Sequence, residues 1–112
     1  MLIFKIVPRP EWESAGESYA GSPHDKADGF LHFSTRAQLP ETLRLYYAGV
    51  TDLVLVAVEA DKLGEALKWE HSASRGEDFP HLYGPLPLSA VLWSEPLNRK
   101  ADGEFLLPGD KT

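Results

Sequence analysis

The stretch Asp28-Gly29-Phe30-Leu31-His32-Phe33-Ser34-Thr35 places polar side chains inside an otherwise apolar, strand-like pattern. A strand points alternate residues to opposite faces, so Phe30, His32 and Ser34 share one face and the two hydrophobic residues between them share the other. We expect the second face to be core and the face with His32 to carry chemistry. A competing structural interpretation makes His32 a half-buried, hydrogen-bonded histidine and Ser34 or Thr35 a cap for the next helix.

A second stretch, Phe79-Pro80-His81-Leu82-Tyr83-Gly84-Pro85-Leu86, repeats this alternation, with His81 and Tyr83 two residues apart. Two such clusters in a short chain predict one shared cleft. Its expected lining can donate and accept hydrogen bonds and offers an aromatic face, which suits a hydroxyl-bearing ligand such as a ribose. The candidate lining residues are His32, Ser34, Thr35, Glu70, His81 and Tyr83.

Length and composition predict a single globular domain over residues 1–112. The chain has 112 residues, of which 43% are hydrophobic and 25% charged. That length supports one core, and the composition lies inside the ordinary globular range.

Charge, cysteine content and hydropathy limit the classes of partner and the compartment that we expect for the chain. The net charge of −6 disfavours a nucleic-acid partner, which would require clustered Lys and Arg. No cysteine is present, which excludes disulfides and thiolate chemistry and is typical of a reducing compartment. No apolar run approaches the length of a membrane span, so no membrane partner and a cytoplasmic location are expected. The oligomeric state stays open.

The order of elements predicts an α+β fold with a mostly antiparallel, curved sheet and short helices. The strongest strand, at 52–59, is apolar almost throughout and is expected to be central. Further strands are predicted at 2–7, 28–35, 68–72, 89–94 and 103–107, helices at 10–15 and 40–47, a turn of helix at 36–39 and another at 61–67, and loops at 17–27 and 73–78.

The spacing of residues also predicts which individual side chains are buried and which face the cleft. Leu39, Leu43 and Tyr46 or Tyr47 follow helical spacing and are predicted to be core rather than a cofactor-binding face. Leu55 and Trp69 are also predicted to be core. Glu70, next to Trp69 in an extended segment, is expected to point the other way, into the cleft.

Two other chemistries fit the sequence less well. The histidines His24, His32, His71 and His81 match no compact ligand spacing, so no metal site is predicted, and His24 is expected to be an exposed loop residue. A serine hydrolase would require a nucleophile elbow of the Gly-x-Ser-x-Gly type, which is missing.

Three blocks carry a resemblance to a known family. Residues 28–35 with Gln38, Leu39 and Thr42, then Lys68-Trp69-Glu70, then residues 79–84 resemble the signature blocks of the domain of unknown function 952 family. The resemblance covers about Ile3 to Phe105. That family is similar in fold to the ADP-ribosyltransferases, which bind NAD between split, curved sheets and break its nicotinamide glycosidic bond.

The resemblance implies roles for the cleft residues. His32 and Ser34, with Thr35 beside them, would contact the NAD ribose, and Tyr83 or His81 would stack near the nicotinamide. Glu70 would stabilise the oxocarbenium-like state, and Glu70 and His81 are the candidate catalytic residues. Phe33 departs from the enzymes, in which glycine commonly follows the strand histidine.

Three hypotheses follow for the function. The first is an NAD-dependent ADP-ribosyl or glycosyl transferase, or a hydrolase of the same bond, with NAD as cofactor and no metal. The second is a non-catalytic domain that binds a nucleotide or small metabolite. An RNA 2′-phosphotransferase-like activity is a third, but it would require clustered arginines, and those of this chain are scattered along an acidic sequence.

Overall fold

The structure is a computed structural model that describes residues 1–108. Its first sheet is antiparallel, with strand order β1-β4-β8. The three strands are β1 (Leu2–Pro8), β4 (Leu53–Glu59) and β8 (Val91–Pro96). The predicted central strand is confirmed, because β4 lies between the other two and six of its seven residues are buried.

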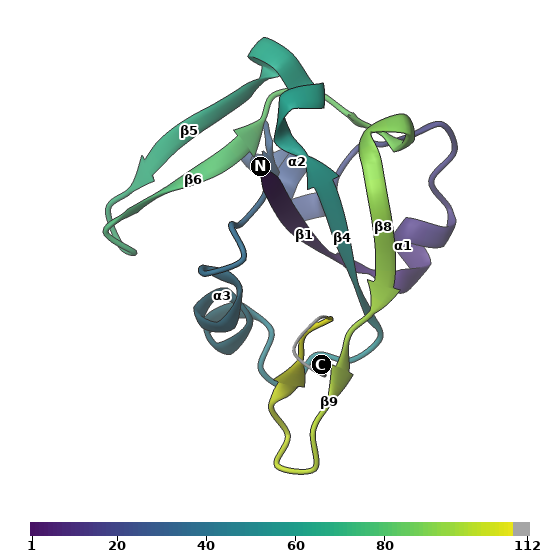
Figure 1. The fold of residues 1–112 in the computed structure, drawn as a ribbon, viewed down its shortest axis with the longest axis vertical. Helices are drawn as coiled ribbons and strands as arrows, with labels where there is room; N and C mark the ends of the chain where they lie inside the picture. Colours follow the sequence, from purple (N-terminus) through teal and green to yellow (C-terminus); the bar gives the residue numbers. More distant parts are fainter. Residues whose placement is uncertain (109–112) are drawn as a thin grey trace.

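The second sheet is also antiparallel, with strand order β3-β6-β5. It consists of β3 (Leu31–His32), β6 (Glu77–Leu82) and β5 (Leu67–Ser72). Within it His32 pairs with His81, and Phe4 of β1 forms an isolated bridge with Ser34 just beyond β3. Figure 1 shows the hairpin of β5 and β6 diverging from the first sheet, with α3 (Leu39–Tyr46) below the opening between them.

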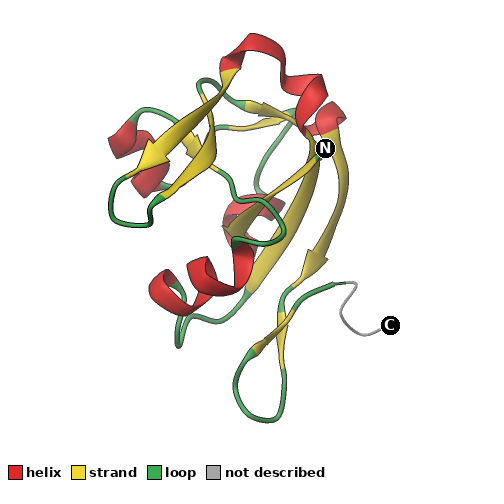
Figure 2. Ribbon diagram, turned by 60° about the vertical axis from the view of Figure 1, so that its left-hand side comes forward, coloured by secondary structure: helices red, strands yellow, loops and turns green. Residues whose placement is uncertain are grey.

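Short helices and two small strand pairs complete the fold (Figure 2). The α-helices besides α3 are α1 (Arg9–Glu13) and α2 (Pro23–Asp28), and the 3₁₀ segments are η1 (Ala60–Ala66) and η2 (Leu88–Ala90). The small pairs are β2 (Ser18–Tyr19) with β7 (Leu86–Pro87) and β9 (Asn98–Arg99) with β10 (Phe105–Leu106). The predicted α+β class with mostly antiparallel sheets is confirmed. Within residues 1–108 no helix is long and apolar enough to cross a bilayer.

Apolar clusters cover both faces of the first sheet. Alternate residues of β1 and β4 enter each cluster, as strand geometry requires. On one face Leu31 and Leu82 from the second sheet join Ile3 and Val56. On the other face Leu39 and Leu43 of α3 pack against Leu55 and its neighbours. The second sheet therefore presents one face to the core and leaves the face of His32 and His81 for a site.

The segment 17–27 differs from the predicted loop. It contains β2 and most of α2, and the helix starts with a capping box in which Ser22 and Asp25 exchange backbone and side-chain hydrogen bonds. The predicted strand at 28–35 is correspondingly shorter. Asp28 ends α2, and Gly29 with φ of 86° reverses the chain before β3 begins.

The predicted placement of Trp69 is wrong, and of the two tyrosines offered for the apolar face of α3 Tyr46 does not lie in the core. Trp69 is 42% exposed because β5 is an edge strand whose outer residues lack a covering layer. Tyr46 is 61% exposed at the end of α3, whereas Leu39, Leu43 and Leu55 are buried as predicted. Tyr47, the other tyrosine that the spacing offered, is partly buried and packs against the cluster of Leu39, Leu43 and Leu55, so the predicted apolar face extends to Tyr47.

Candidate functional site

A pocket of about 620 Å³ lies against the uncovered face of the second sheet, with α3 contributing to its wall. His32 and His81, from adjacent strands, both line it, as their matching alternation predicts. Their ring centroids are 5.6 Å apart. All four histidines of the chain contribute to the lining, which consists of His24, Phe30, His32, Phe33, Ser34, Thr42, Tyr46, Tyr47, His71, Ser72, Arg75, Phe79 and His81.

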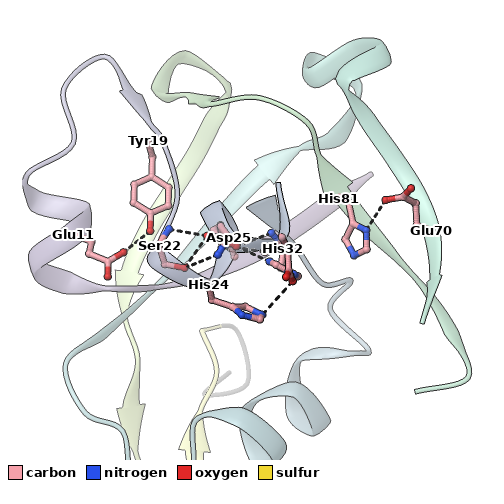
Figure 3. Close-up of polar contacts among 10 residues, drawn as sticks. Glu11, Tyr19, Ser22, His24, Asp25, His32, Glu70 and His81 are labelled. Atoms are coloured by element: carbon pink, nitrogen blue, oxygen red, sulfur yellow. Dashed lines mark hydrogen bonds and ion pairs between the residues drawn. The ribbon is translucent and has the colours of Figure 1, made fainter. Parts of the chain in front are cut away.

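His32 is held between two carboxylates (Figure 3). Its Nδ1 lies 2.6 Å from Asp25 Oδ1, and its Nε2 lies 2.8 Å from Asp28 Oδ2. Its backbone N–H also donates to Asp25 Oδ1. Because both ring nitrogens face carboxylate oxygens, the orientation of the imidazole is set before any ligand arrives.

Asp25 anchors this arrangement from the buried side. Its side chain is only 2% exposed and pairs with the equally buried Lys5, whose Nζ lies 2.9 Å from Asp25 Oδ2. Lys5 also donates to the carbonyl of His32. Burial by itself raises the pKa of Asp25, but the hydrogen bond from His32 and the charge of Lys5 outweigh it and hold that pKa below its usual range. A carboxylate is therefore maintained beneath His32.

His81 is paired with Glu70, which lies on the neighbouring strand β5. The distance from His81 Nδ1 to Glu70 Oε1 is 2.8 Å, and Tyr83 Oη donates to the same oxygen over 2.7 Å. The hydrogen bonds from His81 and then Tyr83 lower the pKa of Glu70, and the Glu70 carboxylate raises the pKa of Tyr83. Because Nδ1 is engaged by Glu70, the other ring nitrogen of His81 is the one left for a ligand.

Phe30 links these two histidine clusters. Its ring stacks on His81 with centroids 4.0 Å apart and an interplanar angle of 24°. It also contacts His32 and Tyr83, with centroid distances of 4.6 Å and 5.3 Å. The floor of the pocket is therefore aromatic, while polar groups from the two histidine clusters surround it.

Arg75 is the one lysine or arginine among the pocket-lining residues that the structure describes. Its guanidinium stacks over Phe79 and donates from Nη1 to Thr42 Oγ1. Its Nη2 is buried and has no hydrogen-bond partner within residues 1–108. An unused buried donor is energetically unfavourable, so an anionic oxygen brought next to this guanidinium would be stabilised.

The structure brings only part of the predicted site to the pocket wall. Ser34 lines the pocket, although it is 5% exposed and its backbone bonds to Phe4. Thr35 does not line the pocket. Its Oγ1 accepts from the Gln38 N–H while its own N–H donates to the Gln38 side chain. Thr35 therefore closes the turn at 36–38 rather than capping α3, whose N-cap is Gln38 and has no side-chain cap.

Glu70 and Tyr83 lie behind the wall rather than on it. Glu70 shares a face of the second sheet with His81, as expected, but its side chain is 39% exposed, does not line the pocket and contacts the lining residue His81. Tyr83 is likewise connected through Phe30 and Glu70. We therefore regard Glu70 as the partner of His81 rather than as a group that contacts a ligand directly.

Sequence reasoning missed several lining residues, namely His24, Tyr46, Tyr47, His71 and Arg75. His24 is exposed as predicted, but it lies on α2 and its ring stacks on His32 at a centroid distance of 4.6 Å. The Ser-x-x-Asp pattern at Ser22 and Asp25 was the available signal, since a helix there places His24 and Asp28 on one face.

The chain belongs to the family described as "Protein of unknown function (DUF952)", whose sequence model matches residues 6–94. No curated protein matches the chain. The family membership agrees with the resemblance of the three sequence blocks.

Solved structures of CC0527 from Caulobacter crescentus are similar over nearly the whole chain. The crystal structure has 47% sequence identity and a TM-score of 0.88, and the match covers 96% of this chain and 95% of that one. The solution NMR structure has 46% identity and a TM-score of 0.83, and the match covers 99% and 96% of the two chains.

Proposed function

We propose that the pocket binds a ribose-bearing nucleotide, with NAD as the specific candidate, and that His81 and Glu70 act on the bond between its ribose and nicotinamide. The observation that carries this proposal is the pairing of His32 with His81 on one pocket wall, each oriented by a carboxylate. Two sheets that are joined at one bridge and then diverge are in keeping with the ADP-ribosyltransferase resemblance.

The lining supplies a partner for each part of such a ligand. The aromatic floor at Phe30 and His81 offers a stacking surface for a base or a nicotinamide ring. Ser34 and the Asp28–His32 pair offer hydrogen bonds to ribose hydroxyls, which requires a hydroxyl to share or replace the Asp28 contact. Arg75 supplies positive charge for a phosphate.

The chemical step follows from the His81–Glu70 pair. With Nδ1 hydrogen-bonded to Glu70, the Nε2 of His81 accepts a proton from a water or an acceptor hydroxyl. The resulting oxygen nucleophile forms a bond to the anomeric carbon, and the carbon–nitrogen bond to nicotinamide breaks. The electron pair of that bond neutralises the pyridinium nitrogen, so nicotinamide leaves uncharged and the proton remains on His81.

The experiment measures nicotinamide release from NAD by the wild type, Glu70→Gln, His81→Ala and Asp78→Asn. Loss of general-base catalysis should lower turnover by about 10²- to 10⁴-fold in the first two variants while NAD affinity changes little in Glu70→Gln. Asp78→Asn is the matched control, because Asp78 pairs with His71 in the same hairpin through exposed side chains. Equal loss in the control would contradict the assignment.

A non-catalytic nucleotide-binding domain is the second candidate. It is favoured by Glu70, which lies outside the pocket wall, and by Phe33, which is buried where the enzymes of the resemblance commonly have glycine. Binding of NAD by the wild type with no nicotinamide released above buffer, with or without acceptors, would select this candidate.

A further inference from the structure

We infer that His24, Asp28 and His32 form a binding site for a divalent transition-metal ion of the zinc type at the rim of the pocket. One ligand atom from each residue lies within 4.8 Å of the others. The site goes beyond the proposed nucleotide function and is tested without nucleotide, although it uses the same Asp28–His32 pair that the proposed function assigns to ribose hydroxyls.

The spacing of the ligand atoms suits a tetrahedral ion. Zinc bonds to nitrogen and oxygen of about 2.0–2.2 Å place neighbouring ligand atoms about 3.3 Å apart. The distance from Asp28 Oδ2 to His32 Nε2 is 2.8 Å, and its distance to His24 Nε2 is 3.6 Å, so the two separations bracket that value. The His24 ring is stacked on His32 at an interplanar angle of 18°, so it must turn before both ring nitrogens point at one ion. Its side chain is 75% exposed, which allows that rotation without disturbing the core.

His32 has a carboxylate partner at Nδ1, the ring nitrogen that would not bind the ion, as metal-binding histidines commonly do. Metal-bound histidines usually present their second ring nitrogen to a carboxylate, which orients the ring and increases its basicity. Asp25 occupies that position 2.6 Å from His32 Nδ1, and it is buried and fixed by Lys5 and by the capping box at Ser22. An ion bound at Nε2 would take the place of the direct contact between His32 Nε2 and Asp28 Oδ2.

The chain geometry explains why the spacing in sequence did not reveal this site. His24 and Asp28 lie one helical turn apart on α2, and Gly29 then reverses the chain so that His32 returns beside them from β3. His24 and His32 both line the pocket. Three protein ligands leave at least one coordination position of a tetrahedral ion for water or for an oxygen of a pocket ligand.

Two measurements on the full chain test the site. The first is calorimetric titration with Zn²⁺ in the absence of nucleotide, and the second is the visible spectrum of the Co²⁺-loaded protein. The wild type should bind one equivalent and give the intense absorption of tetrahedral Co²⁺. His24→Ala and Asp28→Asn alter exposed side chains and should remain folded. Loss of a side chain that only hydrogen-bonds to a metal ligand weakens metal binding by about 10- to 100-fold. Each of these two variants removes a ligand itself and should weaken Zn²⁺ binding by more than that.

His71→Ala is the matched control, because His71 also lines the pocket but lies outside the cluster. It should bind Zn²⁺ as the wild type does. The inference is overturned if the wild type takes up no Zn²⁺, if His24→Ala and Asp28→Asn bind it unchanged, or if His71→Ala weakens it equally. Because no nucleotide is present, failure here is distinct from failure of NAD binding.

Discussion

At the residue scale, Asp25 matters most, because its two oxygens join three parts of the chain. It accepts hydrogen bonds from Lys5 of β1, from His32 of β3 and from the backbone N–H of Ser22. The contribution of Asp25 to stability can therefore be measured by substitution.

Asp25→Asn should destabilise the protein by about 3–5 kcal/mol, because it leaves the Lys5 ammonium, 5% exposed, without its buried counter-charge. Urea denaturation measures the change. Asp52→Asn is the matched control, since Asp52 pairs with Arg9 at the surface and asparagine tolerates the positive φ of 64° found there. Its effect should stay within about 1 kcal/mol. Similar losses in both variants would contradict the role given to Asp25.

Glu70 should make stability depend on pH in a defined direction. Its folded-state pKa is lowered by His81 and Tyr83, so the stabilisation is fully present above the unfolded-state pKa of about 4.3 and is lost as the pH falls through the lower folded-state value. The difference in melting temperature between the wild type and Glu70→Gln should thus be largest near neutral pH and should shrink as the pH is lowered into the acid range. A difference that stays constant from neutral pH into acid, or one matched by the exposed Glu65→Gln, would contradict this.

At the element scale, α2 decides where the site residues lie. The helix is short, and its start depends on the hydrogen bond that Ser22 Oγ accepts from the Asp25 N–H. Ser22→Ala should therefore cost about 1 kcal/mol in unfolding free energy. It should also move the NMR signals of the stacked His24 and His32 rings. Ser14→Ala, an exposed hydroxyl bonded to the Glu11 carbonyl, should do neither, and a matching response would remove the special role of the cap.

The elements that could be predicted from sequence are those with strong local patterns. The apolar run of β4 and the Pro40 start of α3 predicted their structure closely, because each pattern has one stable packing solution. In contrast, α2 and the short β3 depend on a capping box and a left-handed Gly29, which look like loop composition in sequence. His24 was missed as a lining residue for the same reason, because it lies on α2.

Pairing between distant strands explains which parts of the site could be foreseen. The alternation in the two stretches correctly predicted that His32 and His81 share a cavity. It did not predict that Glu70 lies behind His81, since that depends on the register of β5 against β6, in which Glu70 is opposite Phe79. It also did not predict the exposure of Trp69, because edge position is a property of the whole sheet.

At the scale of the whole molecule, the two sheets meet at one bridge and leave a pocket on the uncovered face of the second. The central claim is that this pocket is a nucleotide site. A second hollow lies on another part of the surface, lined by Met1 and Trp69 among others, and serves as the comparison site in the titration below.

The most direct test is a titration of the isotope-labelled protein with NAD, followed by the backbone and side-chain NMR signals. Saturable shifts should gather at Ser34, Arg75 and His81, and His81→Ala should weaken binding by about 1–3 kcal/mol. The absence of any saturable shift, or shifts gathered at Met1 and Trp69 instead, would contradict the account.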